Sequence, residues 1–303
     1  MAFDMRSRVA LVTGAGRGLG RSHALALAGR GACVVVNDTG GSLDGTGASV
    51  DVADAVVDEI ARAGGRAVAS HDDVATHAGA RAAVQLALAT WGRLDALVNN
   101  AGILRDRSFG KLPEEDFDAV VRGHLGASAY CTRAAWNALK ASGSGRVVFT
   151  TSASGLYGQF GQANYASAKA GLVGLLNVLK LEGARSGIGV NAVAPIAATR
   201  MTDGLLSAEL LAGLRPELVT PAVVFLASAE CAETGLILQA GGGLISRVQV
   251  VETAPLELGG GDVRDEDVAA LVGELVAMEP GTPFPSTLEA LARVLDTAAS
   301  PPR

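Results

Sequence analysis

The sequence contains little cysteine, few aromatic residues and no long apolar run. Its 303 residues include three cysteines, Cys33, Cys131 and Cys231, whose scattered positions fit neither a disulfide framework nor a metal-ligand spacing. We therefore expect buried free thiols and no metal site. No stretch reaches the ~18 consecutive apolar residues of a membrane span, and the amino terminus has no signal-peptide core. The sequence predicts a soluble, cytoplasmic protein.

Charge is also scarce. Charged residues make up 18% of the chain, against about 25% in typical proteins. The net charge is −6 and the sequence contains no basic run. Without a basic cluster, the chain lacks the electrostatic footprint of a protein that binds phosphate backbones. We expect neither a nucleic-acid partner nor a membrane partner.

Glycine and small hydrophobic residues are abundant instead. The chain has 39 glycines, 49% hydrophobic residues and only 4% aromatic residues. This glycine content is nearly twice the usual ~7%. Because glycine costs backbone entropy on folding, a surplus is favoured where the backbone turns tightly or approaches a ligand closely.

Short β-branched runs alternate with longer segments rich in alanine and leucine. This pattern is typical of an α/β fold, here a doubly wound (Rossmann) seven-stranded parallel sheet with helices on both faces. The predicted strands are Val9–Thr13, Cys33–Asn37, Ala67–Ser70, Ala96–Asn99, Arg146–Thr150, Gly189–Val193 and Ile237–Gln239. The predicted helices are Arg21–Arg30, Val50–Ala63, Ala78–Trp91, Glu114–Ala141, Tyr165–Ser186 and Pro221–Leu226.

The pattern changes near residue 250. Residues Glu252–Gly261 form a link punctuated by proline and glycine, and two helices are predicted beyond it, Asp265–Met278 and Ser286–Thr297. We expect one main domain over residues 1–250 and a short helical extension over residues 251–303, without a second core.

A glycine-rich turn connects the first predicted strand to the first predicted helix. Such a turn directs the unpaired N–H groups of the helix amino terminus at a pyrophosphate, and the missing side chains let the phosphate approach. An ordinary tight turn is the alternative interpretation. The residues expected to contact the cofactor here are Gly14, Gly16, Arg17, Gly18, Leu19 and Gly20.

Asp38 follows the second predicted strand, 18 positions after Gly20. A carboxylate there would accept hydrogen bonds from the adenosine ribose diol and repel a 2′-phosphate, which favours NAD over NADP. Arg17 would act in the opposite direction. Asp73 and Val74, after the third strand, are candidates for the adenine edge, although a loop aspartate is often only solvated.

Tyr165 and Lys169 lie four positions apart in a predicted helix, which places both side chains on one face. A phenol with a pKa of ~10 is a poor base near neutral pH unless a neighbouring charge stabilises the phenolate. We expect the lysine, a bound nicotinamide charge and a dry site jointly to lower the pKa of the tyrosine. Ser152, at the end of the fifth predicted strand, could hold the substrate oxygen.

These motifs resemble the short-chain dehydrogenase/reductase family over roughly residues 5–250. The matching residues are Thr13-Gly14-x-x-x-Gly18-x-Gly20, Asn99-Asn100-Ala101-Gly102, Ser152 and Tyr165-x-x-x-Lys169. The resemblance implies that Tyr165 is the acid/base, that Ser152 positions the reacting oxygen, and that Tyr165 and Lys169 also contact the nicotinamide ribose. It further implies that Asn99, Ala101 and Gly102 support the cofactor site.

Two positions depart from the family pattern. His124 stands where many members have an asparagine that helps a proton-relay water, so it is a candidate for that relay or a histidine that serves packing. The usual Pro-Gly after the sixth strand is Pro195-Ile196 here. Pro195, Ile196 and Thr199 are still expected beside the nicotinamide, although the branched side chain changes the local shape.

Longer runs resemble one branch of the family, the (3R)-hydroxyacyl-CoA dehydrogenase domains of peroxisomal multifunctional enzymes. These runs are Val35–Gly41, Asn99–Phe109 and Gly158–Tyr165. The resemblance implies oxidation of a (3R)-3-hydroxyacyl-CoA with NAD, in a stand-alone form, and Arg105, Arg107 and Arg200 are candidate contacts for the phosphates of CoA. Ordinary surface or ion-pair arginines are the alternative.

Two other functions stay open at this point. One is a dehydrogenase for hydroxysteroids or other secondary alcohols, and the other is a noncatalytic module that senses dinucleotides. The resemblance also implies a homodimer or homotetramer paired through Glu114–Ala141 and Tyr165–Ser186, where Ala170, Gly171 and Gly174 would permit close packing.

Overall fold

The computed structural model describes residues 4–197, 213–258, 264–279, 281 and 283. The candidate residues Thr199 and Arg200 and the predicted helix Ser286–Thr297 lie outside the described residues. The chain divides into two compact units, Met1–Arg247 and Val248–Arg303, and each is described by itself.

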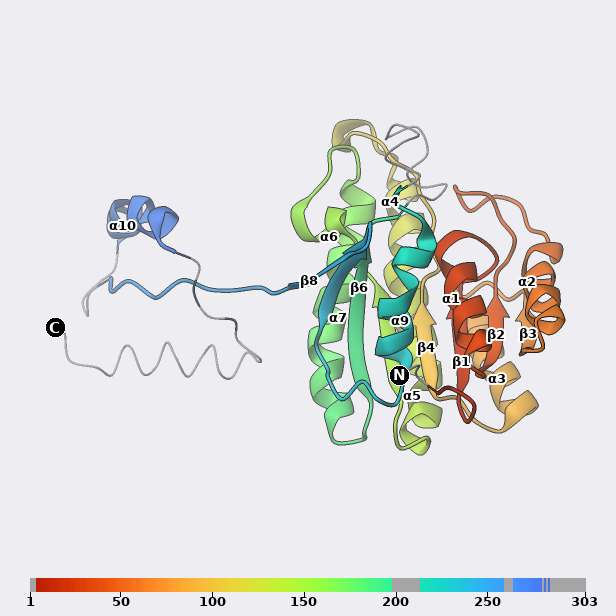
Figure 1. Ribbon diagram of the computed structural model, residues 1–303. Helices are drawn as coiled ribbons and strands as arrows, with labels where there is room; N and C mark the ends of the chain where they lie inside the picture. Colours follow the sequence, from red (N-terminus) through yellow and green to blue (C-terminus); the bar gives the residue numbers. More distant parts are fainter. Residues whose placement is uncertain (1–3, 198–212, 259–263, 280, 282, 284–303) are drawn as a thin grey trace. The chain divides into compact units, whose positions relative to one another are not determined.

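The first unit is built on one sheet with the strand order β3-β2-β1-β4-β5-β6-β7-β8 (Figure 1). Neighbouring strands from β3 to β7 run parallel, with Val9 opposite Cys33 and Val147 opposite Val190 in the register. This order reverses between β1 and β4, as in doubly wound folds. The strands are β1 (Val9–Thr13), β2 (Cys33–Asn37), β3 (Arg66–Ser70), β4 (Ala96–Asn99), β5 (Arg146–Thr150), β6 (Gly189–Pro195), β7 (Ile237–Gly241) and β8 (Leu244–Val248).

The predicted fold class and all seven predicted strands are confirmed. Every residue of β1, β2, β4 and β5 is buried, because helices cover both faces of the sheet. Continuous apolar runs of this kind made the strands recognisable in the sequence. The buried core includes Val34, Val36 and Val98 of the sheet and Leu27 of the first helix.

Helices cover the two faces of the sheet. On one face α1 packs against α2 and α9, and on the other α3 packs against α5, which in turn contacts α7 (Figure 1). The helices of the first unit are α1 (Gly18–Gly29), α2 (Asp51–Arg62), α3 (His77–Trp91), α4 (Glu114–Val121), α5 (Ala127–Ala141), α6 (Ala153–Tyr157), α7 (Ala163–Ala184) and α9 (Thr220–Ala227), with single 3₁₀ turns η1 (Phe109–Lys111) and η3 (Pro216–Leu218).

The predicted helix Glu114–Ala141 contains a turn that the sequence analysis did not anticipate. A π-helical turn, η2 (Arg122–Gly126), separates α4 from α5. Such turns are rare, and they occur often at functional sites. Here the π turn carries the candidate residue His124, which is buried.

An eighth strand, which the sequence analysis did not predict, follows β7 through a two-residue turn. Gly242 and Gly243 both have positive φ angles, 56° and 79°, as a type I′ hairpin turn requires. So short a connection makes β8 antiparallel to β7. Gly241 is needed for another reason: a Cβ there would lie 2.0 Å from the carbonyl oxygen of Ile196.

All three cysteines are free and buried, as predicted. Burial raises the pKa of the Cys131 thiol to about 12. Among the described residues, no helix has the length and apolar character needed to cross a membrane, and no group of three or more histidine, cysteine, aspartate or glutamate side chains could hold a metal ion.

The second unit contains one described helix, α10 (Asp265–Ala277). The predicted helix Asp265–Met278 is thus confirmed to within one residue. Its amino terminus is capped by Asp267, whose carboxylate accepts a hydrogen bond from the backbone N–H of Arg264 at 3.0 Å. No residue of α10 is buried.

Candidate active site

The glycine turn between β1 and α1 has no room for side chains. A Cβ on Gly20 would lie 2.1 Å from the carbonyl oxygen of Gly14, and one on Gly16 would lie 2.9 Å from Oδ2 of Asp38. Gly14 and Gly18 have positive φ angles of 62° and 51°. No side chain caps the amino terminus of α1, and its first turn has no acidic residue. These backbone N–H groups and this clearance fit a pyrophosphate.

The carboxylate of Asp38 lies directly behind this turn. Its Oδ2 accepts a hydrogen bond from the Gly16 N–H at 2.9 Å, and its Oδ1 accepts one from the Gly40 N–H at 2.7 Å. Both oxygens keep further lone pairs, so the arrangement fits an acceptor for a ribose diol. The guanidinium of Arg17 donates to the Gly41 carbonyl at 3.1 Å, which places it on the loop that follows Asp38.

The ends of β1 and β4 are joined by Thr13 and Asn100. The Thr13 hydroxyl accepts hydrogen bonds from the backbone N–H groups of Asn100 and Ala101, and the Asn100 amide donates to the carbonyls of Thr13 and Gly14 at 3.0 Å each. The Asn99 side chain points instead to α5 and donates to Thr132 at 3.1 Å. Asn100, which sequence reasoning did not single out, therefore holds the glycine turn directly.

The two candidates for the adenine edge lie in different surroundings. Val74 is buried, whereas Asp73 is exposed. The Asp73 carboxylate accepts from the Ala75 N–H at 2.9 Å, and its carbonyl accepts from the Thr76 hydroxyl, which caps α3. Asp73 thus organises the loop before α3.

The proposed catalytic side chains come together where β5 ends and α7 begins. Ser152 is the second residue after β5, and its hydroxyl caps α6 by accepting from the Ser154 N–H at 3.1 Å. Tyr165 and Lys169 lie in the first two turns of α7, and Nζ of the lysine is 5.5 Å from the centre of the tyrosine ring. The same Nζ donates to the Thr150 carbonyl at 2.6 Å. The ammonium is therefore anchored to the end of β5 beside the phenol.

Burial shifts the pKa values of both side chains of this pair in the protein alone. Burial raises the pKa of Tyr165, although the hydrogen bond with Ser152 acts in the opposite direction. Burial also lowers the pKa of Lys169 to about 7, since its side chain is only 3% exposed. The expected lowering of the Tyr165 pKa by Lys169, a bound nicotinamide charge and a dry site together applies to the protein with its cofactor and stays a prediction. The spacing of Tyr165 and Lys169 in the sequence predicts that the two side chains are close, but it does not show how far burial removes them from water.

His124 packs edge-on against Tyr165, with ring centres 5.0 Å apart. Its Nε2 lies 2.8 Å from the carbonyl oxygen and 3.1 Å from the backbone nitrogen of Ile103, and its Nδ1 is buried without a partner among the described residues. Burial, together with the charge of Lys169, holds the pKa of His124 well below its usual value. A Cβ on Gly102 would overlap the His124 ring, which explains this glycine.

The residues at the end of β6 are held in place by backbone contacts with β7. The Ile196 N–H donates to the Ala240 carbonyl at 2.8 Å, and Pro195 pairs with Ala240 in the sheet register. The Ile196 side chain is 41% exposed. Its branched side chain is therefore accessible beyond the carboxyl end of β6, where a nicotinamide is expected.

Asn164 is a site residue that sequence reasoning missed. It is fully buried, and its amide donates to the Arg105 carbonyl at 2.9 Å while its Oδ1 accepts from the Tyr165 N–H at 2.8 Å. It thereby links the start of α7 to the loop after β4. In the sequence, the only signal was an asparagine directly before the candidate tyrosine.

The arginines expected at a CoA phosphate differ in their contacts. Arg105 forms an ion pair with Asp116 at 2.9 Å and donates to the Asp44 carbonyl. Its guanidinium thus serves an intrachain ion pair, the alternative interpretation. Arg107 is exposed.

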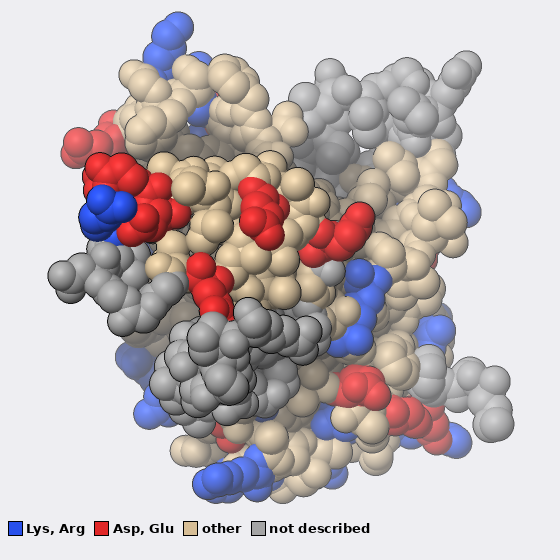
Figure 2. Space-filling model, turned by 90° about the vertical axis from the view of Figure 1, so that its left-hand side faces the viewer, with Lys and Arg blue, Asp and Glu red and all other residues tan. Residues whose placement is uncertain are grey.

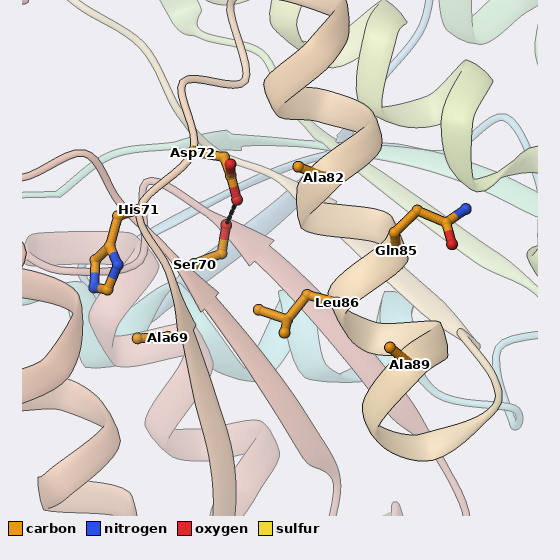
Figure 3. Close-up of a pocket in the computed structure, with 8 residues that line it drawn as sticks. All are labelled: Ala69, Ser70, His71, Asp72, Ala82, Gln85, Leu86 and Ala89. Atoms are coloured by element: carbon orange, nitrogen blue, oxygen red, sulfur yellow. Dashed lines mark hydrogen bonds between the residues drawn. The ribbon is translucent and has the colours of Figure 1, made fainter.

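An open hollow of about 580 Å³ lies away from the catalytic side chains, between the end of edge strand β3 and α3 (Figure 3). It is lined by Ala69, Ser70, His71, Asp72, Ala82, Gln85, Leu86 and Ala89. The Ser70 hydroxyl donates to Asp72 and also accepts from the Asn37 amide at 3.0 Å. These bonds tie β2 to β3 and so help to fix Asp38, the residue after Asn37.

The described surface carries few charges. On the face in Figure 2, the lysine and arginine side chains are scattered among uncharged residues and do not form a continuous patch.

Comparison with known proteins gives the family. Residues 8–209 match the model of the short chain dehydrogenase family. A short-chain type dehydrogenase/reductase of Mycobacterium tuberculosis is 53% identical over 244 residues, which cover 80% of this chain and 85% of that protein. The chain belongs to the short-chain dehydrogenase family, whose members are oxidoreductases.

Two further relatives indicate which branch of the short-chain dehydrogenase family this chain resembles. The mouse peroxisomal multifunctional enzyme type 2 is 50% identical over 82% of this chain, and this chain spans about a third of its length, 33%. A hydroxyacyl-CoA dehydrogenase of M. tuberculosis is 42% identical over 76% of this chain and 75% of that protein. The resemblance to the dehydrogenase domains of peroxisomal multifunctional enzymes is thereby confirmed.

A solved structure shows the same fold. A 7α-hydroxysteroid dehydrogenase in complex with NADH and 7-oxo glycochenodeoxycholic acid superposes with a TM-score of 0.71 at 27% identity, over 79% of this chain and 95% of that one. Its fold holds a nicotinamide dinucleotide.

Proposed function

We propose that this protein is an NAD-dependent dehydrogenase that interconverts (3R)-3-hydroxyacyl-CoA and 3-oxoacyl-CoA. The observation that carries the proposal is the grouping of Ser152, Tyr165 and buried Lys169 at the carboxyl end of β5, beside a glycine turn that fits a pyrophosphate. In open α/β sheets, ligands bind outside the carboxyl ends of the strands.

In the proposed reaction Tyr165 removes the proton of the substrate hydroxyl and returns it in the reverse direction. Ser152 holds the same oxygen by a hydrogen bond. When bound, NAD supplies the hydride acceptor and a positive ring charge. Because burial alone raises the pKa of Tyr165, this charge and a protonated Lys169 have to offset the desolvation of the phenolate. His124 fixes the Ile103 backbone and supports Tyr165 from its edge.

Several residues support NAD as the cofactor. Gly14, Gly16, Gly18 and Gly20 give backbone clearance, and Arg17 and Leu19 lie between them. Asp38 would accept from the adenosine ribose, with Asp73 and Val74 near the adenine. Asn99 ends β4, and Ala101 and Gly102 follow it in the next loop. Pro195, Ile196 and Thr199 would contact the nicotinamide end, where Tyr165 and Lys169 would bind the ribose.

The acyl-CoA substrate is supported by relatives. One of the two M. tuberculosis relatives is a hydroxyacyl-CoA dehydrogenase, and the sequence runs around Asp38, Arg105 and Tyr165 resemble the (3R)-specific domains. A hydroxysteroid is the second candidate, because the superposed dehydrogenase holds a bile-acid derivative.

Replacement of Tyr165 tests the mechanism. Tyr165→Phe removes the transferable proton but keeps the ring against His124, so we expect kcat to fall by about 10²–10⁴-fold and the Kd for NAD to stay within about twofold. Reduced-cofactor absorbance with (3R)-3-hydroxyacyl-CoA esters, hydroxysteroids and simple secondary alcohols gives both turnover and substrate class. Unchanged turnover would exclude the tyrosine mechanism. Oxidation of steroids alone would favour the second candidate.

A noncatalytic sensor makes a different prediction in the same assay. Such a protein would bind NAD without oxidising any alcohol in the panel, and Tyr165→Phe would change nothing. NAD binding measured by calorimetry, together with absent turnover in the unsubstituted protein, would support this alternative.

A further inference from the structure

Two phenylalanines of this aromatic-poor chain are almost fully exposed. Phe109 has 77% and Phe160 89% of its surface exposed, out of seven phenylalanines in the sequence. Leaving a phenylalanine in water forgoes the free energy that burial would provide. Neighbouring exposed apolar residues often mark a binding surface. Phe109 and Phe160 are therefore candidates for a binding surface.

The two residues lie on loops that are paired with each other. The Arg107 N–H donates to the Gly161 carbonyl at 2.9 Å, and Arg107 forms an isolated parallel bridge with Gln162. The Gln162 amide also donates to the Asp106 carboxylate at 2.7 Å. Phe109 follows Arg107 by two positions, and Phe160 directly precedes Gly161. These bonds bring the two aromatic residues to one rim.

The rim adjoins the catalytic side chains. The first loop leads from β4 to α4, and the second leads from α6 to α7. Both loops lie beyond the carboxyl ends of β4 and β5, at the same end of the sheet as α4 and α6 (Figure 1). The amide of Asn164 donates to the Arg105 carbonyl, so the residue before Tyr165 is bound to the loop that carries Phe109. A substrate held at Tyr165 thus has this apolar rim beside it.

We propose that Phe109 and Phe160 bind the acyl chain of the substrate beyond its reacting carbon and select for medium and long chains. The phosphates and amides of CoA gain little from contact with phenyl rings, whereas each buried methylene of an acyl chain gains enough free energy to raise binding about fourfold. A four-carbon ester has only one carbon beyond its reacting carbon, so it offers the rim almost no chain to bind. The inference rests on the proposed dehydrogenase function.

The test is the ratio of kcat/KM for twelve-carbon to four-carbon (3R)-3-hydroxyacyl-CoA. The Phe109→Ser/Phe160→Ser variant should lower this ratio by about tenfold or more and change the four-carbon value by less than about twofold. Phe109→Leu/Phe160→Leu should restore most of the ratio. Leu244→Ser, on the 80% exposed residue of β8, is the matched control and should leave the ratio unchanged.

The outcomes separate the inference from the proposed function. Turnover of both esters with an unchanged ratio in the serine variant overturns the inference and leaves the dehydrogenase intact. A change in oligomeric state by light scattering, with the ratio unchanged, assigns the rim to contact between copies instead. If the unsubstituted protein oxidises no CoA ester, the proposed function fails and the inference falls with it.

Discussion

Lys169 carries its amino group into a site that is almost closed to water. The side chain is 3% exposed, and Nζ has the Thr150 carbonyl as a hydrogen-bond acceptor. One carbonyl replaces only part of the hydration of an ammonium ion, so burial lowers the pKa of Lys169 to about 7. The residue best placed to stabilise a phenolate is itself easily deprotonated in the protein alone.

This lowered pKa predicts a pH dependence of stability. Between pH 7 and the ordinary lysine value of 10.5, the unfolded state binds more protons at this position than the folded state, so stability should rise with pH. Relative to Lys169→Met, the unsubstituted protein should gain about 2 kcal/mol between pH 7 and pH 9. Urea unfolding of both proteins at the two pH values measures this gain. A constant difference would show that the lysine remains charged when buried.

Asp38 predicts the choice of cofactor. Its carboxylate is held by the N–H groups of Gly16 and Gly40, where it can accept from a ribose diol and repel a phosphate. Asp38→Ala should therefore raise the ratio of NADP to NAD use by about tenfold or more, the equivalent of about 1.4 kcal/mol. Initial rates with each cofactor give the ratio. Asp58→Ala, at an exposed position of α2, is the control, and an unchanged ratio in Asp38→Ala would exclude Asp38 as the ribose acceptor.

At the scale of elements, the turn from β1 into α1 depends on the absence of Cβ atoms. Gly20 and Gly29 both belong to α1, but a Cβ on Gly20 would meet the Gly14 carbonyl oxygen at 2.1 Å, while one on Gly29 has nothing within 4 Å. Gly20 and Gly29 therefore differ in their tolerance of a side chain, although they belong to the same helix.

These two positions provide a matched pair of variants. Gly20→Ala should displace the turn and weaken NAD binding by about tenfold or more, because the pyrophosphate site is part of that turn. Gly29→Ala should keep the Kd and stabilise the protein by up to about 1 kcal/mol, the difference in helix propensity. Calorimetry and thermal unfolding measure both quantities. Equal NAD affinity in the two variants would contradict this account of the turn.

The elements that sequence predicted well are those whose packing is uniform. Buried on both faces, β1, β2, β4 and β5 appear as short apolar runs, and their bounds agree with the prediction. β8 escaped prediction because four of its five residues are exposed and no alternation marks a buried face. The π turn at His124 escaped because the helical pattern continues on both sides of it.

In the candidate site too, some features could be predicted from the sequence and others could not. Ser152, Tyr165 and Lys169 could be identified because their spacing is fixed by one strand end and one helix. The direction of an amide side chain is not encoded by spacing, so the roles of Asn99 and Asn100 emerged only from their hydrogen bonds. The pKa of Tyr165 depends on burial, which the sequence does not measure.

At the scale of the whole molecule, one face of α7 is apolar and exposed. Ala170, Gly174, Val178 and Leu181 recur at helical intervals, and Val178 and Leu181 are each 53% exposed. Gly174 has no atom within 4 Å of a built Cβ. This face supports the prediction that two copies pair through α5 and α7, with Gly171 close to Leu125 inside each copy.

Substitution on this face tests the predicted pairing. Gly174→Arg places a bulky charge at the centre of the apolar stripe and should convert the predicted dimer or tetramer into smaller species, with the Kd for self-association raised at least about 100-fold. Gln85→Arg on α3, exposed and at the other edge of the sheet, is the control. Light scattering over a concentration series gives the mass, and an unchanged mass for Gly174→Arg would rule out α7 as the interface.

Because Ile196 contacts β7, the last parallel strand, the candidate active site is completed only late in the chain. The glycine turn, Asp38 and Tyr165 all lie in the first 165 residues of the chain, whereas Ile196 obtains its backbone partner only from Ala240 and its clearance only from Gly241. During synthesis on the ribosome, the adenosine half of the cleft can therefore assemble well before the nicotinamide half. A nascent chain that ends before β7 therefore lacks Ala240 and Gly241, the residues that support Ile196.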